Sequence, residues 1–466
     1  MALKQHSLGD PRRQRRGAVL IIVLWICLGL VVLVLYFADS INSELQAAAN
    51  RVGEVEARQA VAAGTRYAAY ILNNYAIDGV VPDSGIAPDP TADYYAGALR
   101  VGDDPGDPQF WFIGRDVNNP PTTDPVFCLV DEASKLNLNT ATSGMFNALP
   151  MANMTSDFSA AIVSWRTRQS QSSGSALNSA YSTLDPPRLN KGAPFESVDE
   201  LRLVYGATLD LLFGEDTNLN GTLDPNEDDG DQSPPHDNQD GQLQPGMFEY
   251  VTVFSNQPTT THSGAARLNI TNIRTPQGTA QLRALLTRKG ISADRAAAIV
   301  RNLGPGAASF SSVADFMLAS GMTESEFALI HTSVTGSSSA GLVNVNTASA
   351  TVLACIPGIG PTSAPSLVAY RLANPPALTS LVWLTRVLSP AAIRRAGPYI
   401  TDQSYQFSAD IAAVGRFGRG YHRERVVFDT TMGTPRIIYR QDLTAYGWAL
   451  GSKIRKMLKP HETQRG

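Results

Sequence analysis

The chain has 466 residues, of which 43% are hydrophobic and 17% charged, and its formal net charge is −4. This composition excludes wholesale disorder, which requires low hydrophobicity and high net charge, and it excludes coiled-coil and collagen-like chains, whose compositions are more biased. The low charged content, with abundant Ser, Thr and Asn, favours a protein that lives outside the cytoplasm. Three cysteines are too few for a disulfide framework; Cys128 and Cys355 either pair with each other or remain buried thiols.

The N-terminus joins a basic segment to an apolar one. Residues 1–17 carry five basic residues and one acidic residue, and residues 18–37 carry no charge. A helix of that length spans roughly 30 Å, the hydrocarbon thickness of a bilayer, and a flanking basic cluster stays in the cytoplasm. The sequence therefore predicts a single membrane span with a cytoplasmic N-terminus. Apolar residues continue at helical spacing over 38–78, which predicts an amphipathic extension of the same helix.

An acidic segment, residues 215–240, contains nine carboxylates and no Lys or Arg. Its first part, residues 216–227, has oxygen-bearing residues at alternate positions, Gly at the sixth position and Glu at the twelfth, as in EF-hand calcium loops. Because no cationic side chain compensates these carboxylates, the sequence predicts one bound Ca²⁺. The expected ligands are Asp216, Asn218, Asn220, Thr222, Asp224 and Glu227.

The remaining carboxylates of this segment allow a second Ca²⁺. Its candidate ligands are Asp228, Asp231, Asp237 and Asp240. The alternative for the whole segment is a solvated acidic linker, since stretches rich in Asn, Asp, Gly and Pro also form plain turns. Pro225 lies within the loop and two further prolines follow it, which disfavours the flanking helices of a regulatory EF-hand. A structural ion that fixes a long loop is therefore the expectation.

Two stretches of sequence repeat at an offset of 207 residues. LNLNTATSGMFNALP (136–150) matches VNVNTASATVLACIP (343–357), and each copy runs into a helix that ends in an arginine, Arg166 or Arg371. A weaker copy begins at residue 267. Each copy is followed by a serine that precedes apolar residues at helical spacing and is expected to cap a helix: Ser197, Ser312 and Ser380. The sequence thus predicts three related helical units.

The last copy, residues 345–371, resembles the helix-hairpin-helix motif, whose Pro-Gly-Ile-Gly turn is Pro357–Gly360 here. In nucleic-acid-binding members such a turn presents backbone N–H groups to a phosphate. Residues 361–364 read Pro-Thr-Ser-Ala, where DNA binders commonly place lysines. A structural turn or a protein-contact surface is therefore favoured, and no nucleic acid is expected as a partner.

Runs of β-branched and aromatic residues before, between and after the helical units predict strands. They lie at 99–102, 109–114, 126–131, 248–254, 405–414, 423–429 and 436–442. The predicted fold class is α+β, in which a long N-terminal helix packs on a small antiparallel sheet with large helix-hairpin-helix or SAM-like insertions. No G-x-S-x-G, H-E-x-x-H or Cys–His arrangement occurs in the sequence, so we expect no enzyme activity.

The junction between leader and apolar segment, RRQRRG followed by AVLIIVLW, resembles the processing site of type IV pilins and pseudopilins. The resemblance implies that a prepilin peptidase cuts between Gly17 and Ala18 and that the new N-terminus is methylated. Removal of residues 1–17 would change the formal net charge from −4 to −8. The family's glutamate at the fifth mature position, which pairs with a neighbouring subunit's terminal amine, is replaced by Ile22. This departure fits a specialised minor subunit.

Together with LVDEASKLNLN (129–139), PFESVDELRLVYG (194–206) and the acidic segment, this junction is similar to the type II secretion protein K family, the large minor pseudopilins. The resemblance implies a pilin-like body in the periplasm, an anchor in the inner membrane, and bound calcium. It also implies a non-catalytic cap at the pseudopilus tip that helps to initiate assembly. The implied partners are the minor pseudopilins I and J, the inner-membrane secretion platform and an exported substrate. The alternative is a membrane-anchored, extracytoplasmic DNA-binding protein of the competence type.

The expected domain division follows from these features. It comprises a leader (1–17), a transmembrane helix (18–37), its amphipathic extension (38–78), pilin-like strands (79–135), a first helical domain (136–262) with the acidic segment (215–240), second and third helical units (263–402) that include the hairpin (345–371), and C-terminal strands (403–466). The extra unit 263–335 exceeds the usual size of the resembled family.

Overall fold

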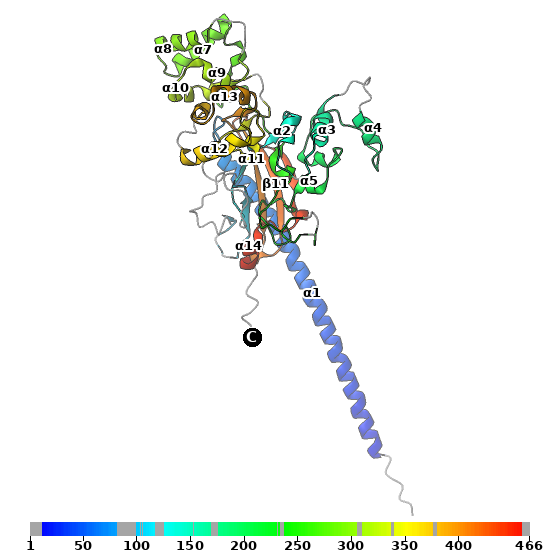
Figure 1. Cartoon of the computed structure of the whole chain (residues 1–466). Helices are drawn as coiled ribbons and strands as arrows, with labels where there is room; N and C mark the ends of the chain where they lie inside the picture. The colour runs from blue at the N-terminus through cyan, green and yellow to red at the C-terminus, as the bar shows by residue number, and fades with distance from the viewer. Residues whose placement is uncertain are drawn as a thin grey trace, which may run out of the picture.

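Helix α1 runs without interruption from Arg12 to Tyr75, and the body of the protein is attached to its C-terminal part (Figure 1). The computed structural model describes residues 12–81, 99–102, 104, 106–116, 125–151, 153–168, 176–230, 232–233, 237–304, 310–336, 340–375 and 380–458, and only the backbone of 12–18, 99–100 and 176–178. No proline occurs within α1, so no helical hydrogen bond is lost along it. The helix is long and apolar enough to cross a membrane.

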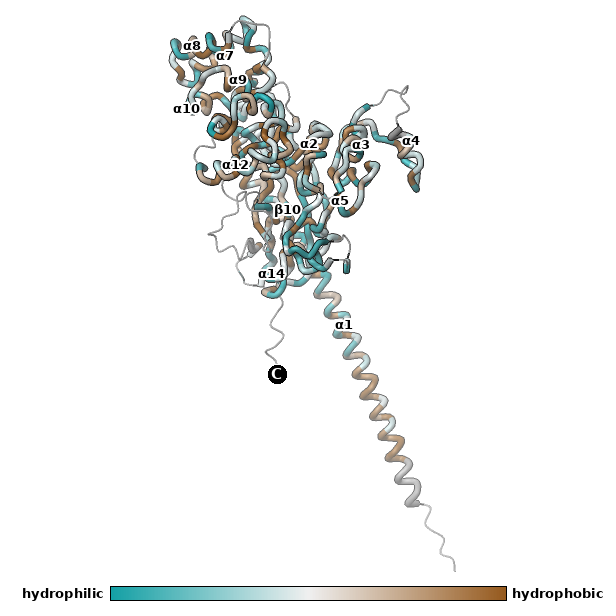
Figure 2. The backbone as a smooth tube through the Cα atoms, viewed as in Figure 1, coloured by the Kyte–Doolittle hydropathy of each residue, from teal (hydrophilic) through white to brown (hydrophobic). Residues whose placement is uncertain are grey.

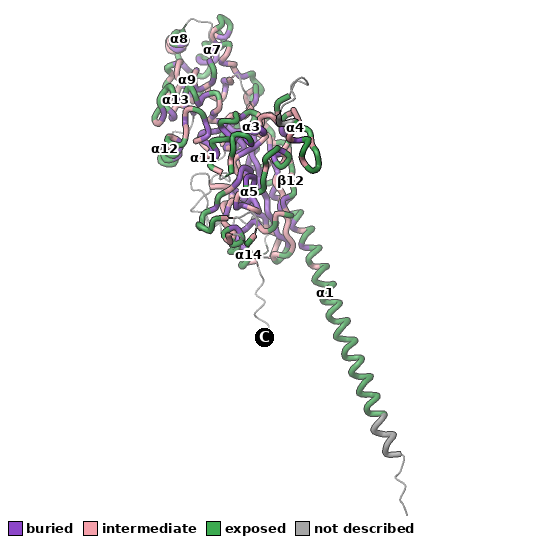
Figure 3. Tube along the Cα trace, turned by 45° about the vertical axis from the view of Figure 1, so that its right-hand side comes forward, coloured by how far each residue is buried: buried purple, intermediate pink, exposed green. Residues whose placement is uncertain are grey.

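The two parts of α1 have different surroundings. The large apolar side chains of residues 19–37 are exposed, and Figures 2 and 3 show this part of the helix standing free of the body. Farther along, Val61 and Leu72 are buried against the sheet. Gly64 permits this close approach, because a Cβ atom there would lie 2.9 Å from Ile411 Cγ2. The apolar residues of α1 therefore fall into two groups. Those at 19–37 are exposed outside the body, and those farther along, such as Val61 and Leu72, form part of its core.

The sheet under α1 has six antiparallel strands in the order β1-β2-β10-β11-β12, with β3 also paired to β10. The strands are β1 (Leu99–Arg100), β2 (Gln109–Ile113), β3 (Val130–Asp131), β10 (Gln406–Val414), β11 (His422–Asp429) and β12 (Arg436–Asp442). Asp131 of β3 lies opposite Phe407 of β10. The chain therefore leaves the sheet at β3 and returns at β10, and the helical units are inserted between these two strands.

Both faces of the sheet are covered. Phe112 and Ile411 belong to the core that the sheet forms with α1. On the opposite face, Trp111 and Ala412 pack with Ile454 of the C-terminal helix α14 (Gly451–Leu458). All nine residues of β10 are buried as a result. This arrangement confirms the predicted α+β class.

Each of the three inserted units opens and closes with a two-residue parallel strand pair. The pairs are β4 (Leu136–Asn137) with β5 (Val251–Thr252), β6 (Leu268–Asn269) with β7 (Val334–Thr335), and β8 (Val343–Asn344) with β9 (Ile400–Thr401). In each pair an Ile or Val followed by Thr closes the unit. The recurring pair shows that the sequence repeat is a structural repeat, including its weak middle copy.

Short helices fill the three units, and the second unit lies farthest from the free end of α1 (Figure 1). They are α2 (Ser143–Asn147), α3 (Ser156–Arg166), α4 (Ala176–Ser182), α5 (Leu209–Phe213), α6 (Met247–Tyr250), α7 (Pro276–Arg288), α8 (Ala293–Asn302), α9 (Val313–Ser320), α10 (Glu324–Ala328), α11 (Ala350–Ala354), α12 (Gly360–Ala373) and α13 (Pro390–Ala396). The three predicted cap serines each immediately precede a helix. Ser312 and Ser380 accept a backbone N–H there, and Ser197 forms a capping box with Glu200.

The strand predicted at 248–254 is wrong for most of its length. Residues 247–250 form helix α6, and only Val251 and Thr252 are in a strand, outside the main sheet. Phe248 and Tyr250 raise the strand propensity of this stretch, but Met247 and Phe248 are buried in the core of the first unit. Tertiary packing thus overrides local propensity here.

Candidate functional site

The first part of the acidic segment forms a closed loop after α5. Asp216, its first residue, accepts hydrogen bonds from the backbone N–H groups of Asn220 and Gly221, both at 2.9 Å. Glu227, its twelfth residue, accepts from the backbone N–H of Thr217 at 2.8 Å. The two carboxylates that the sequence places at the ends of the loop therefore hold its turns together.

Glycine is required at the sixth position of this loop. Gly221 has φ +74°, a backbone conformation that side chains disfavour. A Cβ atom at Gly221 would also lie 2.6 Å from Nε of Arg115. The loop and the guanidinium group are thus in direct contact, and the sequence pattern alone gives no sign of this contact.

The three central ligand candidates meet in the structure. The side-chain amides of Asn218 and Asn220 both donate to Oδ2 of Asp224, at 2.7 and 2.9 Å. Their Oδ1 atoms accept from backbone N–H groups two residues later, those of Asn220 and Thr222, at 2.9 and 2.7 Å. The six predicted calcium ligands are therefore contributed by one compact, internally hydrogen-bonded loop.

Burial perturbs the carboxylates of this loop. The exposed fractions of Asp216 and Glu227 are 1% and 2%. Burial raises the pKa of Asp216 to about 6 and that of Glu227 to about 7, because removal from water disfavours the charged form. The pKa of Asp224 is also raised, again mainly by burial. The carboxylates of the loop are thus close together and shielded from the water that would stabilise their negative charge.

The donor chemistry of the loop fits a hard cation. Within the described part of the chain, its three carboxylates form no salt bridge, whereas the neighbouring Glu249 and Asp410 pair with Arg115 and Arg423. No group of three or more His, Cys, Asp or Glu side chains among the described residues is placed to hold a metal ion. A cation at this loop would therefore also need amide and carbonyl oxygens, which are the ligands that Ca²⁺ accepts beside carboxylates.

Two arginines, the buried Arg423 and the partly buried Arg115, attach the loop to the face of the sheet that α14 covers. Arg423 of β11 is fully buried and forms a bidentate pair with Asp410, with both N–O distances 2.8 Å. Arg423 also donates to the backbone carbonyls of Asn218 and Leu219. Arg115 donates to the carbonyls of Leu219 and Asn220, at 3.0 and 3.1 Å. The loop is therefore attached to the sheet through its backbone carbonyls, and these arginine contacts do not use its side-chain oxygens.

The second half of the acidic segment has a different structure. Asp237 accepts from the backbone N–H groups of Asp229 and Gly230, at 2.8 and 2.7 Å. Asp240 is exposed and accepts from the backbone of Gln242 at 2.8 Å. Asp228 is exposed, and Asp231 lies outside the described residues. Asp237 and Asp240 therefore stabilise turns, and among the described residues the carboxylates of this half form no group of three placed to hold a metal ion.

The repeated hairpins share one internal contact. Arg166 donates to the carbonyls of Leu138 and Ala141 in the first unit. In the third unit Arg371 donates to the carbonyls of Val345 and Ala348. The arginine in the last turn of each repeated helix therefore fastens that helix to the start of its own unit, which is a structural role.

The Pro-Gly-Ile-Gly turn of the third unit lies at the protein surface. Gly358 and Gly360 have φ +94° and +67°, and Gly360 begins α12. An open hollow beside the turn is lined by residues of the first and third units, including Thr142 and Arg395. Arg395 is the basic residue of this lining, and it comes from α13 rather than from the hairpin itself.

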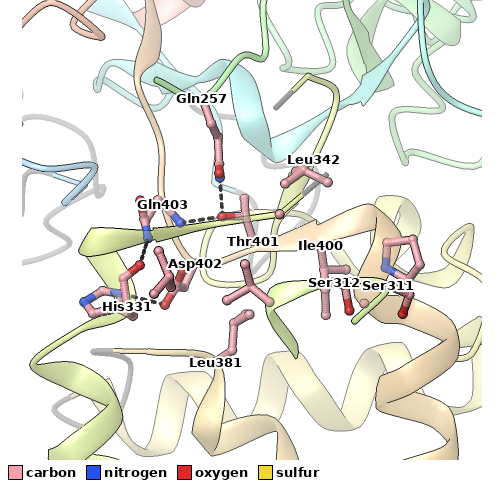
Figure 4. A pocket seen from close by; sticks show the side chains of 15 residues that line it. Gln257, Ser311, Ser312, His331, Leu342, Leu381, Ile400, Thr401, Asp402 and Gln403 are labelled. Atoms are coloured by element: carbon pink, nitrogen blue, oxygen red, sulfur yellow. Dashed lines mark hydrogen bonds and ion pairs between the residues drawn. The ribbon is translucent and has the colours of Figure 1, made fainter. Parts of the chain in front are cut away.

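A histidine that sequence spacing leaves isolated has a partner in the fold. His331 Nδ1 lies 2.8 Å from Asp402 Oδ2, beside a cavity of about 70 Å³ between the second and third units (Figure 4). Gln403 donates to the His331 carbonyl at 3.0 Å. Ser312 also lines this cavity, but its hydroxyl accepts from the Asp315 backbone as a helix cap. The cluster therefore joins the second and third units.

The remaining sequence predictions concern the N-terminus and the cysteines. α1 continues through Gly17 and Ala18, whose side chains lie outside the described residues. The side chain of Ile22 is exposed. Cys128 and Cys355 are both buried and unpaired, so the alternative of buried free thiols is the one that the structure shows.

Comparison with known proteins gives one family match. Residues 338–396, which form most of the third unit, match the family model described as a helix-hairpin-helix motif. No curated protein sequence matches the chain. Among solved structures, the chain is similar to one chain of the crystal structure of the GspK-GspI-GspJ complex from the type 2 secretion system of enterotoxigenic Escherichia coli. That similarity covers 83% of this chain and 96% of the other, with 9% identity and a TM-score of 0.34, values too low to carry an argument.

Proposed function

We propose that this protein is a minor pseudopilin of a type II secretion machinery, and that its helical units cap the tip of the pseudopilus. The observation that carries the proposal is α1, whose exposed apolar residues 19–37 continue into a half that packs on an antiparallel sheet. A filament subunit needs such a helix, because its free part can lie in the membrane and later among neighbouring helices. The inserted units enlarge the body at the end remote from the membrane.

The proposed partners are the minor pseudopilins I and J, the pseudopilus, the inner-membrane secretion platform and the prepilin peptidase, with an exported substrate as a transient contact. The proposed location is the inner membrane, with the body in the periplasm, and the proposed role involves no catalysis. The test is purification of the full chain from membranes in mild detergent. We expect a complex with one copy of this chain beside smaller pseudopilins, and a homopolymer of this chain would contradict the proposal.

Ile22 provides a mechanism for the tip position. An apolar side chain at the fifth position after the proposed cleavage site cannot pair with a neighbouring subunit's terminal amine. This chain would therefore accept subunits only beneath it, and assembly would begin there. Introducing Ile22→Glu should allow the chain to enter the filament shaft, which gold labelling of isolated filaments can detect. Ile21→Glu, one position earlier, is the matched control, and tip-only labelling in both variants would contradict the mechanism.

We further propose that residues 216–227 hold one Ca²⁺. Asp216, Asn218, Asn220, Thr222, Asp224 and Glu227 would be its ligands. The ion would supply positive charge to buried carboxylates whose pKa values are raised by burial. The supporting observations are the burial of every proposed ligand except Asp224, which is partly buried, and the absence of salt bridges to the loop carboxylates within the described residues.

Isothermal titration of the detergent-solubilised full chain tests the calcium proposal. We expect one site with a Kd no weaker than about 10⁻³ M, the range of weak extracellular sites. Glu227→Gln should abolish the binding heat, whereas Asp240→Asn, a carboxylate change in the exposed half of the same segment, should leave it unchanged. Absence of a binding heat with the unchanged protein would refute the proposal.

DNA binding is a second candidate function, favoured by the family match over 338–396. The glycine turn and Arg395 beside it could contact a phosphate. Mobility-shift titration of the full chain with duplex DNA at two salt concentrations tests this candidate. Salt-dependent binding that Arg395→Ala weakens would support it. Absence of a shift at low salt would exclude it and leave the hairpin a structural element.

A further inference from the structure

The acidic loop contacts the C-terminal segment, which is remote from it in sequence. The amide nitrogen of Asn218 lies 3.3 Å from the carbonyl oxygen of Trp448. The amide nitrogen of Asn220 lies 3.4 Å from the carbonyl oxygen of Ala449. These two carbonyls lie three and two residues before Gly451, the first residue of α14. Two neighbouring side chains of the loop thus donate to two consecutive peptide groups at the start of the last helix.

The hydrogen bonds fix which end of each amide faces the C-terminal segment. Both Oδ1 atoms accept from backbone N–H groups of the loop, those of Asn220 and Thr222. Both Nδ2 atoms face acceptors only, namely Asp224 Oδ2 and the two carbonyls. A carboxylate has no N–H group to donate. Asp is therefore incompatible with these contacts, although calcium loops accept Asp and Asn alike at these positions.

The loop cannot move away from the segment without breaking buried contacts. Its backbone is held by Arg115 and Arg423, as described above, and the exposed fraction of Asn220 is 1%. On the other side, Ala449 and Leu450 are fully buried. They belong to the same core as Ile454 of α14 and Trp111 of the sheet. The amides therefore lie between two fixed surfaces.

We propose that Asn218 and Asn220 are positioning residues that fasten the C-terminal segment 448–458 to the calcium loop. An oxygen that binds a cation polarises its amide and makes the N–H a better donor. Calcium at the loop thereby strengthens the attachment of α14, which is the part of the inference that rests on the proposed calcium function. Calcium binding would thus stabilise the packing of α14 on the sheet as well as the loop itself.

Hydrogen–deuterium exchange of the full chain in detergent, read in peptides that cover 448–458, tests this inference. The double variant Asn218→Asp and Asn220→Asp keeps an oxygen at each position and removes both donors. We expect about tenfold faster exchange in 448–458, with or without calcium, because two buried acceptors lose their donors. Asn226→Asp is the matched control. Asn226 is in the same loop and exposed, and within the described residues its side chain has no hydrogen bond to segment 448–458.

The outcomes separate this inference from the calcium proposal. Unchanged exchange of 448–458 in the double variant would overturn the inference, whatever calcium does. Slower exchange of 448–458 on adding calcium to the unchanged protein would support the coupling, and calcium binding without that slowing would overturn it. If calcium does not bind at all, the calcium proposal fails, and the comparison in EGTA still tests the amide contacts. The single variant Asn218→Asp, with exchange of β10 and β11 as a folding control, serves if the double variant unfolds.

Discussion

The acidic segment has two halves of similar composition and opposite surroundings. Residues 216–227 are mostly buried and are hydrogen-bonded to the sheet and the C-terminal segment. Asp240 and Asp228 in the second half lie at the surface. Both halves are rich in Asp and Asn, but only the first is held by Arg115 and Arg423. The number of carboxylates therefore does not define a cation site. Attachment of the first half to the body excludes water from its carboxylates, and their negative charge then needs a cationic partner.

The largest expected effect comes from breaking that attachment. Arg423→Met leaves Asp410 buried without its bidentate partner and removes a donor from the loop carbonyls of Asn218 and Leu219, of which Leu219 keeps Arg115. We expect the free energy of unfolding to fall by about 3–5 kcal/mol, measured by urea unfolding of the full chain in detergent. Arg425→Met, which removes a more exposed partner of the same carboxylate, should cost about 1 kcal/mol or less. Equal losses in the two variants would contradict the role given to Arg423.

Asp131 is a buried carboxylate outside the acidic segment, and it serves as a comparison for the loop carboxylates because no cation is proposed to bind it. Its carboxylate is buried and accepts from the hydroxyls of Ser404 and Thr347, and burial raises its pKa to about 6. Between about pH 4 and pH 6 the folded chain keeps a proton that the unfolded chain loses, so stability falls as pH rises through this window, by roughly 3 kcal/mol. Asp131→Asn should remove this part of the pH dependence in urea unfolding, with EGTA present. An unchanged slope between pH 4 and pH 6 would refute the assignment.

Calcium should stabilise the chain only through the buried half of the segment. At a free concentration a hundred times the Kd, binding to the folded state alone contributes about 2.7 kcal/mol. We expect this gain in thermal unfolding of the unchanged protein and its loss in Glu227→Gln. Full stabilisation of Glu227→Gln by calcium would show that the ion binds elsewhere.

The smallest effect is expected from the exposed half. Asp228→Asn and Asp240→Asn should change the free energy of unfolding by no more than about 0.5 kcal/mol, as for ordinary surface substitutions. The calcium stoichiometry from titration should remain one in both variants. If the unchanged protein binds two Ca²⁺ ions and these variants bind one, the exposed half is also a cation site, and the contrast between the two halves is wrong.

Much of the fold follows from the sequence because its signals are periodic or local. The uninterrupted apolar and amphipathic pattern predicts one long helix, and α1 is continuous from Arg12 to Tyr75. The repeat at an offset of 207 residues predicts equivalent units, and Arg166 and Arg371 make equivalent contacts. The cap serines are predicted from local sequence, and each lies immediately before a helix.

The sequence predicts only part of the candidate site. The loop pattern predicts its own side chains. Arg115, which follows β2, and Arg423 of β11 lie 104 and 204 residues from Leu219, and no spacing rule joins them to the loop. His331 and Asp402 meet for the same reason only in the fold. The failed strand at 248–254 shows the limit of propensity, since burial of Met247 and Phe248 favours a short helix there.

The most direct test of the proposed function is the mass of the full chain extracted from membranes. A pseudopilin loses its leader at the inner membrane, so the account predicts a polypeptide that begins at Ala18 and carries a methylated N-terminus. A protein that still contains residues 1–17 in a membrane with an active prepilin peptidase would contradict the account.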